Sequence, residues 1–129
     1  MILKPFQIEK IKIEDKKNFL FYGENQGHKN QIIEKKFKKK YKENVYYYEE
    51  SEILHDENNF FNNVLSKSFF ENEKLIIVNR ATDKIKDILE KLIKKKIEDL
   101  IIILNANTLE KKSKIRSLFE KGKDTFCVP

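Results

Sequence analysis

The chain of 129 residues is poor in the residues that build disulfide frameworks, zinc sites and flexible linkers. Its one cysteine, Cys127, excludes an intrachain disulfide, which fits a reducing cytoplasm, and we expect this thiol to be buried. The two histidines, His28 and His55, belong to no Cys/His cluster with zinc-ligand spacing, so we expect both on the surface and no metal site. Because no Gly/Ser/Pro-rich linker interrupts the chain, we expect residues 1–129 to form a single domain.

Long apolar runs and arginine are scarce as well. No stretch reaches the roughly 18 apolar residues of a membrane span, and residues 1–5 lack the pattern of a signal peptide. We therefore expect a cytoplasmic protein without a membrane partner. The net charge of +6 would suit a nucleic acid, but only Arg80 and Arg116 are arginines, which read phosphates and bases better than lysine does. We interpret the densest lysine run, residues 35–40, as a solvated helix face.

Apolar, β-rich segments alternate with helical patterns along the chain. The predicted strands are Phe19–Tyr22, Val45–Tyr48, Leu75–Val78, Leu100–Leu104 and Thr125–Val128. Some of these strands are apolar throughout, which is expected when helices cover both faces of a sheet. The pattern therefore predicts an α/β fold, a three-layer α/β/α sandwich with a five-stranded, mostly parallel sheet.

Apolar residues at helical spacing predict the helices between these strands. The clearest pattern runs over residues 85–93, with Thr82 or Asp83 as its N-cap. A helix that begins near Gln31 carries apolar residues at every fourth position, and residues 60–65 form a compact apolar stripe. The last helix carries Ile115, Leu118 and Phe119 and is expected to begin at Asn107 or Thr108.

Residues 23–30 resemble a phosphate-binding loop without completing its motif. They follow the first predicted strand and precede a helix, the setting in which G-x-x-x-x-G-K-[ST] binds phosphates. Gly23 and Lys29 stand at the right spacing. His28 replaces the second glycine, which lets the backbone approach the phosphates, and Asn30 replaces the hydroxyl residue that binds Mg²⁺. We expect a nucleotide-binding fold with a vestigial loop and no cofactor.

The acidic residue of a nucleotide site is missing too. A carboxylate that follows an apolar strand normally helps to hold Mg²⁺, but the asparagines Asn79 and Asn105 follow two of the predicted strands. Asp83 comes too late along the chain, and we expect the acidic residues of Glu49–Glu52 to contact solvent only. No enzyme signature emerges from these residues, and we do not expect this chain to hydrolyse ATP.

An aromatic pair stands out in a polar segment just before the third predicted strand. Phe69 and Phe70 lie between Ser68 and Glu71. Neighbouring residues on a short helix project about 100° apart, so both rings rarely enter one core. An exposed aromatic pair is a typical anchor of a protein interface. The alternative is that one ring packs at the rim of the core and the other lies flat on the surface.

Four short segments carry a family resemblance by their order along the chain. They are Phe19–Glu24, an apolar strand that ends in Tyr-Gly-Glu; Ser68–Phe70, directly before Leu75–Ala81; Leu104–Ile115, with its Lys/Ser pattern; and Phe126–Pro129. Together they resemble the N-terminal domain of the delta subunit of bacterial DNA polymerase III, a subunit of the clamp loader. The family usually has a leucine-like residue where this chain has Phe69.

The resemblance implies a fold of the AAA+ type with a degenerate nucleotide site, as part of a longer multidomain subunit. It implies a role in DNA replication in which Ser68, Phe69 and Phe70 bind the sliding clamp, the beta subunit, as a hydrophobic wedge and help to open it. The chain would have no catalysis of its own within the polymerase III holoenzyme, a nucleotidyltransferase complex. Other clamp-loader subunits would be partners and would hydrolyse the ATP, and primer–template DNA would be met indirectly.

Two other functions stay open from the sequence. One is a divergent nucleotide-binding enzyme, a kinase or an ATPase, that uses Lys29. The other is a nucleic-acid-binding domain that uses the lysine-rich helix and whose affinity would depend steeply on salt.

Overall fold

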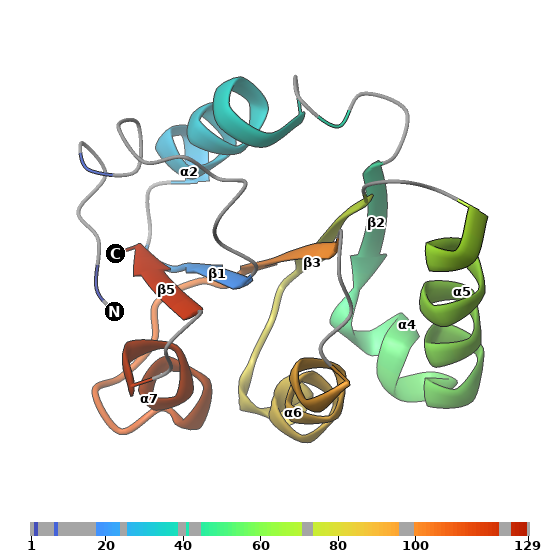
Figure 1. Cartoon of the computed structure of the whole chain (residues 1–129). Helices are drawn as coiled ribbons and strands as arrows, with labels where there is room; N and C mark the ends of the chain where they lie inside the picture. The colour runs from blue at the N-terminus through green and yellow to red at the C-terminus, as the bar shows by residue number, and fades with distance from the viewer. Residues whose placement is uncertain are drawn as a thin grey trace.

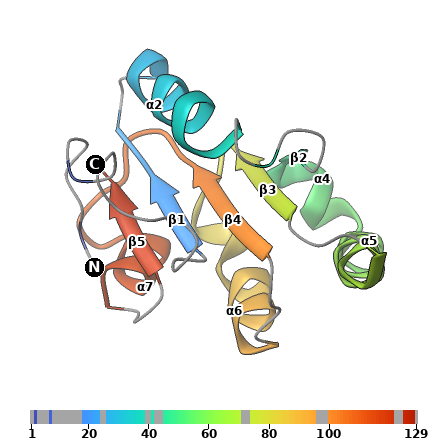
Figure 2. The ribbon, with the colours of Figure 1, turned by 45° about the horizontal axis from the view of Figure 1, so that its top comes forward.

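A computed structural model describes residues 2, 7, 18–23, 26–38, 41, 45–70, 74–95, 100–121 and 125–128, with the backbone alone for 26, 65–70, 125, 126 and 128. Its strands are β1 (Asn18–Phe21), β2 (Val45–Glu49), β3 (Lys74–Asn79), β4 (Leu100–Asn105) and β5 (Thr125–Val128). They lie in the order β2-β3-β4-β1-β5, and each neighbouring pair is parallel (Figure 2). The predicted α/β fold with a parallel sheet is confirmed.

Helices lie on both faces of this sheet (Figure 1). On one face lies α2 (Gln26–Ile32), which continues into a π-helical segment, Ile33–Lys38. The other face carries α6 (Lys86–Lys94) and α7 (Lys114–Lys121). Two further helices, α4 (Glu50–His55) and α5 (Glu57–Phe70), lie beside β2. Among the described residues, no helix is both long and apolar enough to span a bilayer.

Two apolar cores, one on each face, explain why the central strands are apolar throughout. Side chains alternate between the faces of a strand, so in β4 Ile101 and Ile103 face α2 while Ile102 and Leu104 face α6 and α7. The predicted spacing of four on the α2 side is confirmed, because the buried residues there include Ile33, Phe37 and Tyr41. Cys127 is also buried as expected, and burial raises the pKa of its thiol to about 12, so it is unreactive at neutral pH.

Three predicted helix limits are corrected by the structure. The helix expected near Gln31 begins at Gln26, so the second half of the presumed loop is helical. The last helix begins at Lys114 rather than at Asn107 or Thr108, because the Ser113 hydroxyl accepts a hydrogen bond from the backbone N–H of Arg116 and acts as the cap. The aromatic pair does not sit on a short helix; it ends the 14-residue α5.

The N-cap expected before residues 85–93 is confirmed at Thr82. Its side chain accepts a hydrogen bond from the N–H of Lys84 and starts a 3₁₀ turn, Asp83–Ile85, that leads into α6. The strand limits differ from the predicted ones by one residue at most, since polar residues such as Lys74 and Asn105 extend the apolar runs.

Candidate functional site at the carboxyl edge of the sheet

The turn between β1 and α2 contains the residues of the incomplete phosphate-loop motif. Gly23 has φ of 110°, a conformation that glycine adopts without strain, and its N–H donates to the carbonyl of Asn107 at 3.2 Å. His28 and Asn30 are exposed on α2, as expected of His28. Because α2 already begins at Gln26, the motif positions of His28, Lys29 and Asn30 lie on a helix.

Lys29 points inward and is 5% exposed. Its ammonium donates hydrogen bonds to the carbonyl oxygens of Gly23, at 2.8 Å, and of Ala106, at 2.5 Å. Burial lowers the pKa of this lysine below its usual value of 10.5. In a working phosphate loop the lysine would reach the β- and γ-phosphates. Here it joins the turn after β1 to the turn after β4, a structural role that the motif alone did not reveal.

Amides occupy the strand ends at which a nucleotide site carries its carboxylate. The Asn105 side chain donates to Oδ1 of Asn79 at 3.3 Å, and the two residues are paired in register at the ends of β4 and β3. The described residues contain no group of three His, Cys, Asp or Glu side chains that could hold a metal ion. In place of a carboxylate, the ends of β3 and β4 therefore carry two amides that are bonded to each other.

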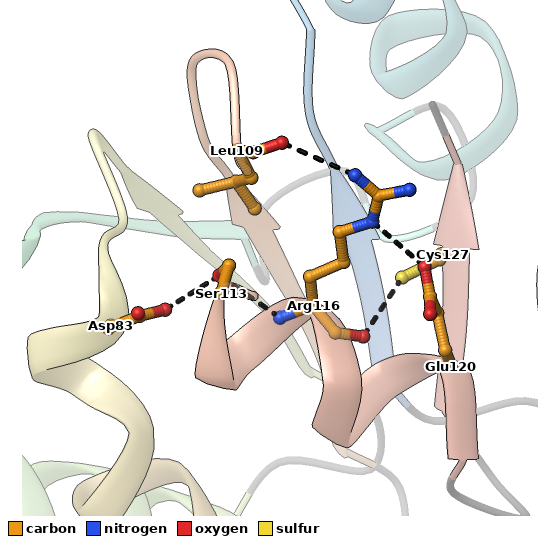
Figure 3. A network of polar contacts seen from close by, with 6 residues as sticks. All are labelled: Asp83, Leu109, Ser113, Arg116, Glu120 and Cys127. Atoms are coloured by element: carbon orange, nitrogen blue, oxygen red, sulfur yellow. Dashed lines mark hydrogen bonds and ion pairs between the residues drawn. The ribbon is translucent and has the colours of Figure 1, made fainter. Parts of the chain in front are cut away.

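Asp83 belongs to a network of hydrogen bonds with residues at the start of α7 (Figure 3). Its Oδ1 accepts hydrogen bonds from the Ser113 hydroxyl at 2.7 Å and from the N–H of Ile115 at 3.1 Å. Burial raises the pKa of Asp83, but these hydrogen bonds outweigh it and hold the pKa below 3.8. In the same network Arg116 binds Glu120 at 2.8 Å. Asp83 therefore fixes the start of α7 and is not placed as a metal ligand.

The acidic cluster after β2 corrects a prediction. Glu50 was expected to contact solvent only, but it is buried and accepts hydrogen bonds from the N–H and the hydroxyl of Thr82. Glu49 and Glu52 form a reciprocal capping box at the start of α4. The spacing of Glu49 and Glu52 is a capping signal that the sequence does contain. The partner of Glu50 lies 32 residues away and has no local signal.

A groove with a volume of about 540 Å³ lies on the α2 side of this edge. Its lining includes Asn30, Lys38, Tyr47, Glu49, Arg80 and Asn105. Among the described residues of the lysine run, Lys38 lines the groove; it binds Glu34 at 2.6 Å and lies over the Tyr47 ring. Lys35 is exposed as expected of a solvated helix face, whereas residues 39 and 40 lie outside the described residues.

The residues expected to contact a partner protein lie elsewhere. Ser68, Phe69 and Phe70 form the last turn of α5, and only their backbone is described. Because β3 begins at Lys74, this end of α5 lies near the amino edge of the sheet, opposite the groove. A buried lysine connects the two elements, since Lys74 donates to the carbonyl of Val64 in α5 at 2.9 Å.

Comparison with known proteins decides the family. A family model described as "DNA polymerase III, delta subunit" matches residues 19–128. The chain belongs to this family. The resemblance drawn from the sequence is therefore confirmed, and membership implies a role related to the clamp loader of DNA polymerase III. No curated protein matches the chain.

Proposed function

We propose that this delta-family chain is the clamp-binding domain of a clamp-loader subunit, in which Ser68, Phe69 and Phe70 form a hydrophobic wedge that binds the sliding clamp and helps to open it. The match to the family over residues 19–128 carries this proposal. A wedge can favour an open clamp only by binding that state more tightly than the closed one. The remainder of a longer subunit would join it to the other loader subunits and bring it indirectly to primer–template DNA.

The placement of the wedge residues at the end of α5 supports this function. Phe60 and Val64 are buried positions of the helix. At about 100° per residue, position 69 lies roughly 180° and position 70 roughly 280° around the axis from Phe60, so neither continues the buried stripe. A helix end that carries two aromatic residues off its core stripe is suited to insertion into a pocket of a partner.

We further propose a fold of the AAA+ type that has lost its own nucleotide chemistry. The contacts of Lys29 with the carbonyls of Gly23 and Ala106 support this reading, as do the amides of Asn79 and Asn105 at the strand ends. Hydrolysis of ATP would fall to other loader subunits. The same contacts weigh against an enzyme that uses Lys29, and the pairing of Lys38 with Glu34 weighs against a free lysine-rich face for nucleic acid.

A calorimetric titration of the sliding clamp tests the wedge. We expect Phe69→Ala/Phe70→Ala to weaken binding by at least about 30-fold, the effect of losing one strong interface anchor of about 2 kcal/mol. Leu54→Ala is the matched control, because Leu54 is an exposed apolar residue on the neighbouring α4. Equal clamp affinity of the double variant and the wild type, with both folded, would refute the wedge.

A further inference from the structure

A buried lysine contacts the helix that carries the proposed wedge. Lys74 is the first residue of β3, is 2% exposed and donates from its ammonium to the carbonyl oxygen of Val64 in α5 at 2.9 Å. Its side chain lies on the same face of β3 as Ile76, which belongs to one apolar core with Val64. An apolar side chain would fill this place without the cost of taking a charge out of water. The ammonium therefore contributes something that packing alone does not.

The carbonyl that Lys74 binds lies one helical turn before the proposed wedge. In an α-helix the carbonyl of residue 64 accepts the N–H of residue 68. Residue 68 is Ser68, the first residue of the wedge, and it lies within α5. The Lys74 ammonium thus holds the oxygen on which the N–H of Ser68 depends.

The helix α5 relies on other elements for its stability. Four of its 14 residues are asparagine and two are serine, whose side chains compete for helical hydrogen bonds, and a helix of this length is marginal in isolation. At its start, the Asp56 carboxylate accepts the N–H of Asn59 at 3.2 Å. One turn further, the ring centroids of Phe60 and Tyr48 lie 5.0 Å apart. Of these contacts, that of Lys74 lies nearest to the wedge.

The other end of this connection is fixed in the sheet. The strand β3 lies between β2 and β4, and Lys74 is paired in register with Leu100 of β4. Central strands are the parts of a fold that open least often. The hydrogen bond from Lys74 to Val64 therefore relates the end of α5 to the most stable part of the molecule.

We propose that Lys74 is a positioning residue for the wedge: its ammonium keeps the end of α5 helical and in a fixed place beside the sheet, so that Ser68, Phe69 and Phe70 are presented together to the sliding clamp. This inference rests on the proposed function of those three residues. A segment that is ordered in only a fraction of the molecules binds more weakly in proportion to that fraction. Lys74 thus raises the affinity without touching the clamp.

The test variant is Lys74→Met, because methionine has an unbranched side chain without the charge. In a calorimetric titration we expect it to bind the sliding clamp about fivefold more weakly than the wild type, as for a wedge that is ordered in about a fifth of the molecules. The melting temperature should change by less than about 5 °C, because removal of a buried charge offsets the lost hydrogen bond. Lys112→Met is the matched control; its side chain is 88% exposed, and the variant should bind as the wild type does.

Hydrogen exchange followed by NMR gives a readout that does not require the clamp. In Lys74→Met the amides of residues 68–70 should exchange at least about fivefold faster than in the wild type, while the amides of β3 keep their rates. Unchanged exchange at residues 68–70 would overturn the inference. An equal acceleration in β3 would overturn it too, because the substitution would then act on the whole fold.

A double-mutant cycle distinguishes failure of this inference from failure of the proposed function. If Lys74 acts through the wedge, adding Lys74→Met to Phe69→Ala/Phe70→Ala should weaken clamp binding by less than about twofold. Loss of affinity in the double alanine variant beside wild-type affinity of Lys74→Met would overturn the inference and leave the proposed function standing. Equal losses in both backgrounds would also overturn it. Wild-type affinity of the double alanine variant would refute the wedge itself, and with it the role of Lys74 in presenting it.

Discussion

The two halves of the carboxyl edge of the sheet differ in how far their polar groups are hydrogen-bonded within the protein. After β1, the Lys29 ammonium bonds the carbonyls of Gly23 and Ala106, and the turn satisfies its own groups. At the ends of β2 and β4, one oxygen each of Glu49 and Asn105 accepts no hydrogen bond from the described residues, and the Glu49 oxygen lies 3.9 Å from Nε of Arg80. One edge of the sheet therefore combines an internally bonded turn with a polar groove.

The largest change in stability is expected when the hydrogen bonds of Lys29 in the turn after β1 are removed. Lys29→Ala would leave the carbonyls of Gly23 and Ala106 without their charged donor, so we expect the free energy of unfolding to fall by about 2 kcal/mol. Urea denaturation at neutral pH measures this loss. Lys35→Ala is the control, because Lys35 is an exposed residue in the π-helical segment that continues α2. This substitution should change the free energy of unfolding by less than about 0.5 kcal/mol. Similar stabilities of the two variants would contradict the assigned role of Lys29.

A smaller change, an increase in stability, is expected from a substitution of Arg80 beside the groove. Arg80→Gly removes the Cβ from a residue with φ of 56° and should stabilise the protein by about 0.5–1 kcal/mol. Arg80→Ala keeps the Cβ and so separates strain from charge, and it should bring no such gain. Thermal unfolding of both variants checks this, and equal melting temperatures for the glycine and alanine variants would rule out strain at this residue.

The smallest effect is a change of stability with pH that arises from the titration of Lys29. Burial lowers the pKa of Lys29 in the folded protein below the 10.5 of an exposed lysine, so the unfolded chain binds more protons between those two values. The stability of the wild type should therefore rise, relative to Lys29→Met, as the pH increases through this window towards 10.5. Denaturation curves at a series of pH values give the difference in the free energy of unfolding between the wild type and Lys29→Met. A difference that falls with pH would show that the folded protein favours the charged lysine.

The sheet was predictable because its signal is local. Apolar runs such as Leu100–Leu104 require covered faces, and the strands formed within one residue of the predicted limits. The helix starts were less predictable, since Asn107 and Thr108 are as good caps by composition as the residue that the chain uses. Ser113 caps α7 while its hydroxyl is bonded to Asp83, 30 residues earlier, and this contact is absent from any local pattern.

By itself, the sequence determined the class of fold, the incomplete motif at Gly23–Asn30 and the family, because these depend on residue types at short spacings. Only the tertiary structure decided which partners the charged residues bind. Lys29 bonds a carbonyl 77 residues away, and Glu50 bonds Thr82 across 32 residues. The enclosed oxygens of Glu49 and Asn105 likewise depend on the register of three parallel strands. Such contacts form only when distant segments fold against one another, so no window of the sequence contains them.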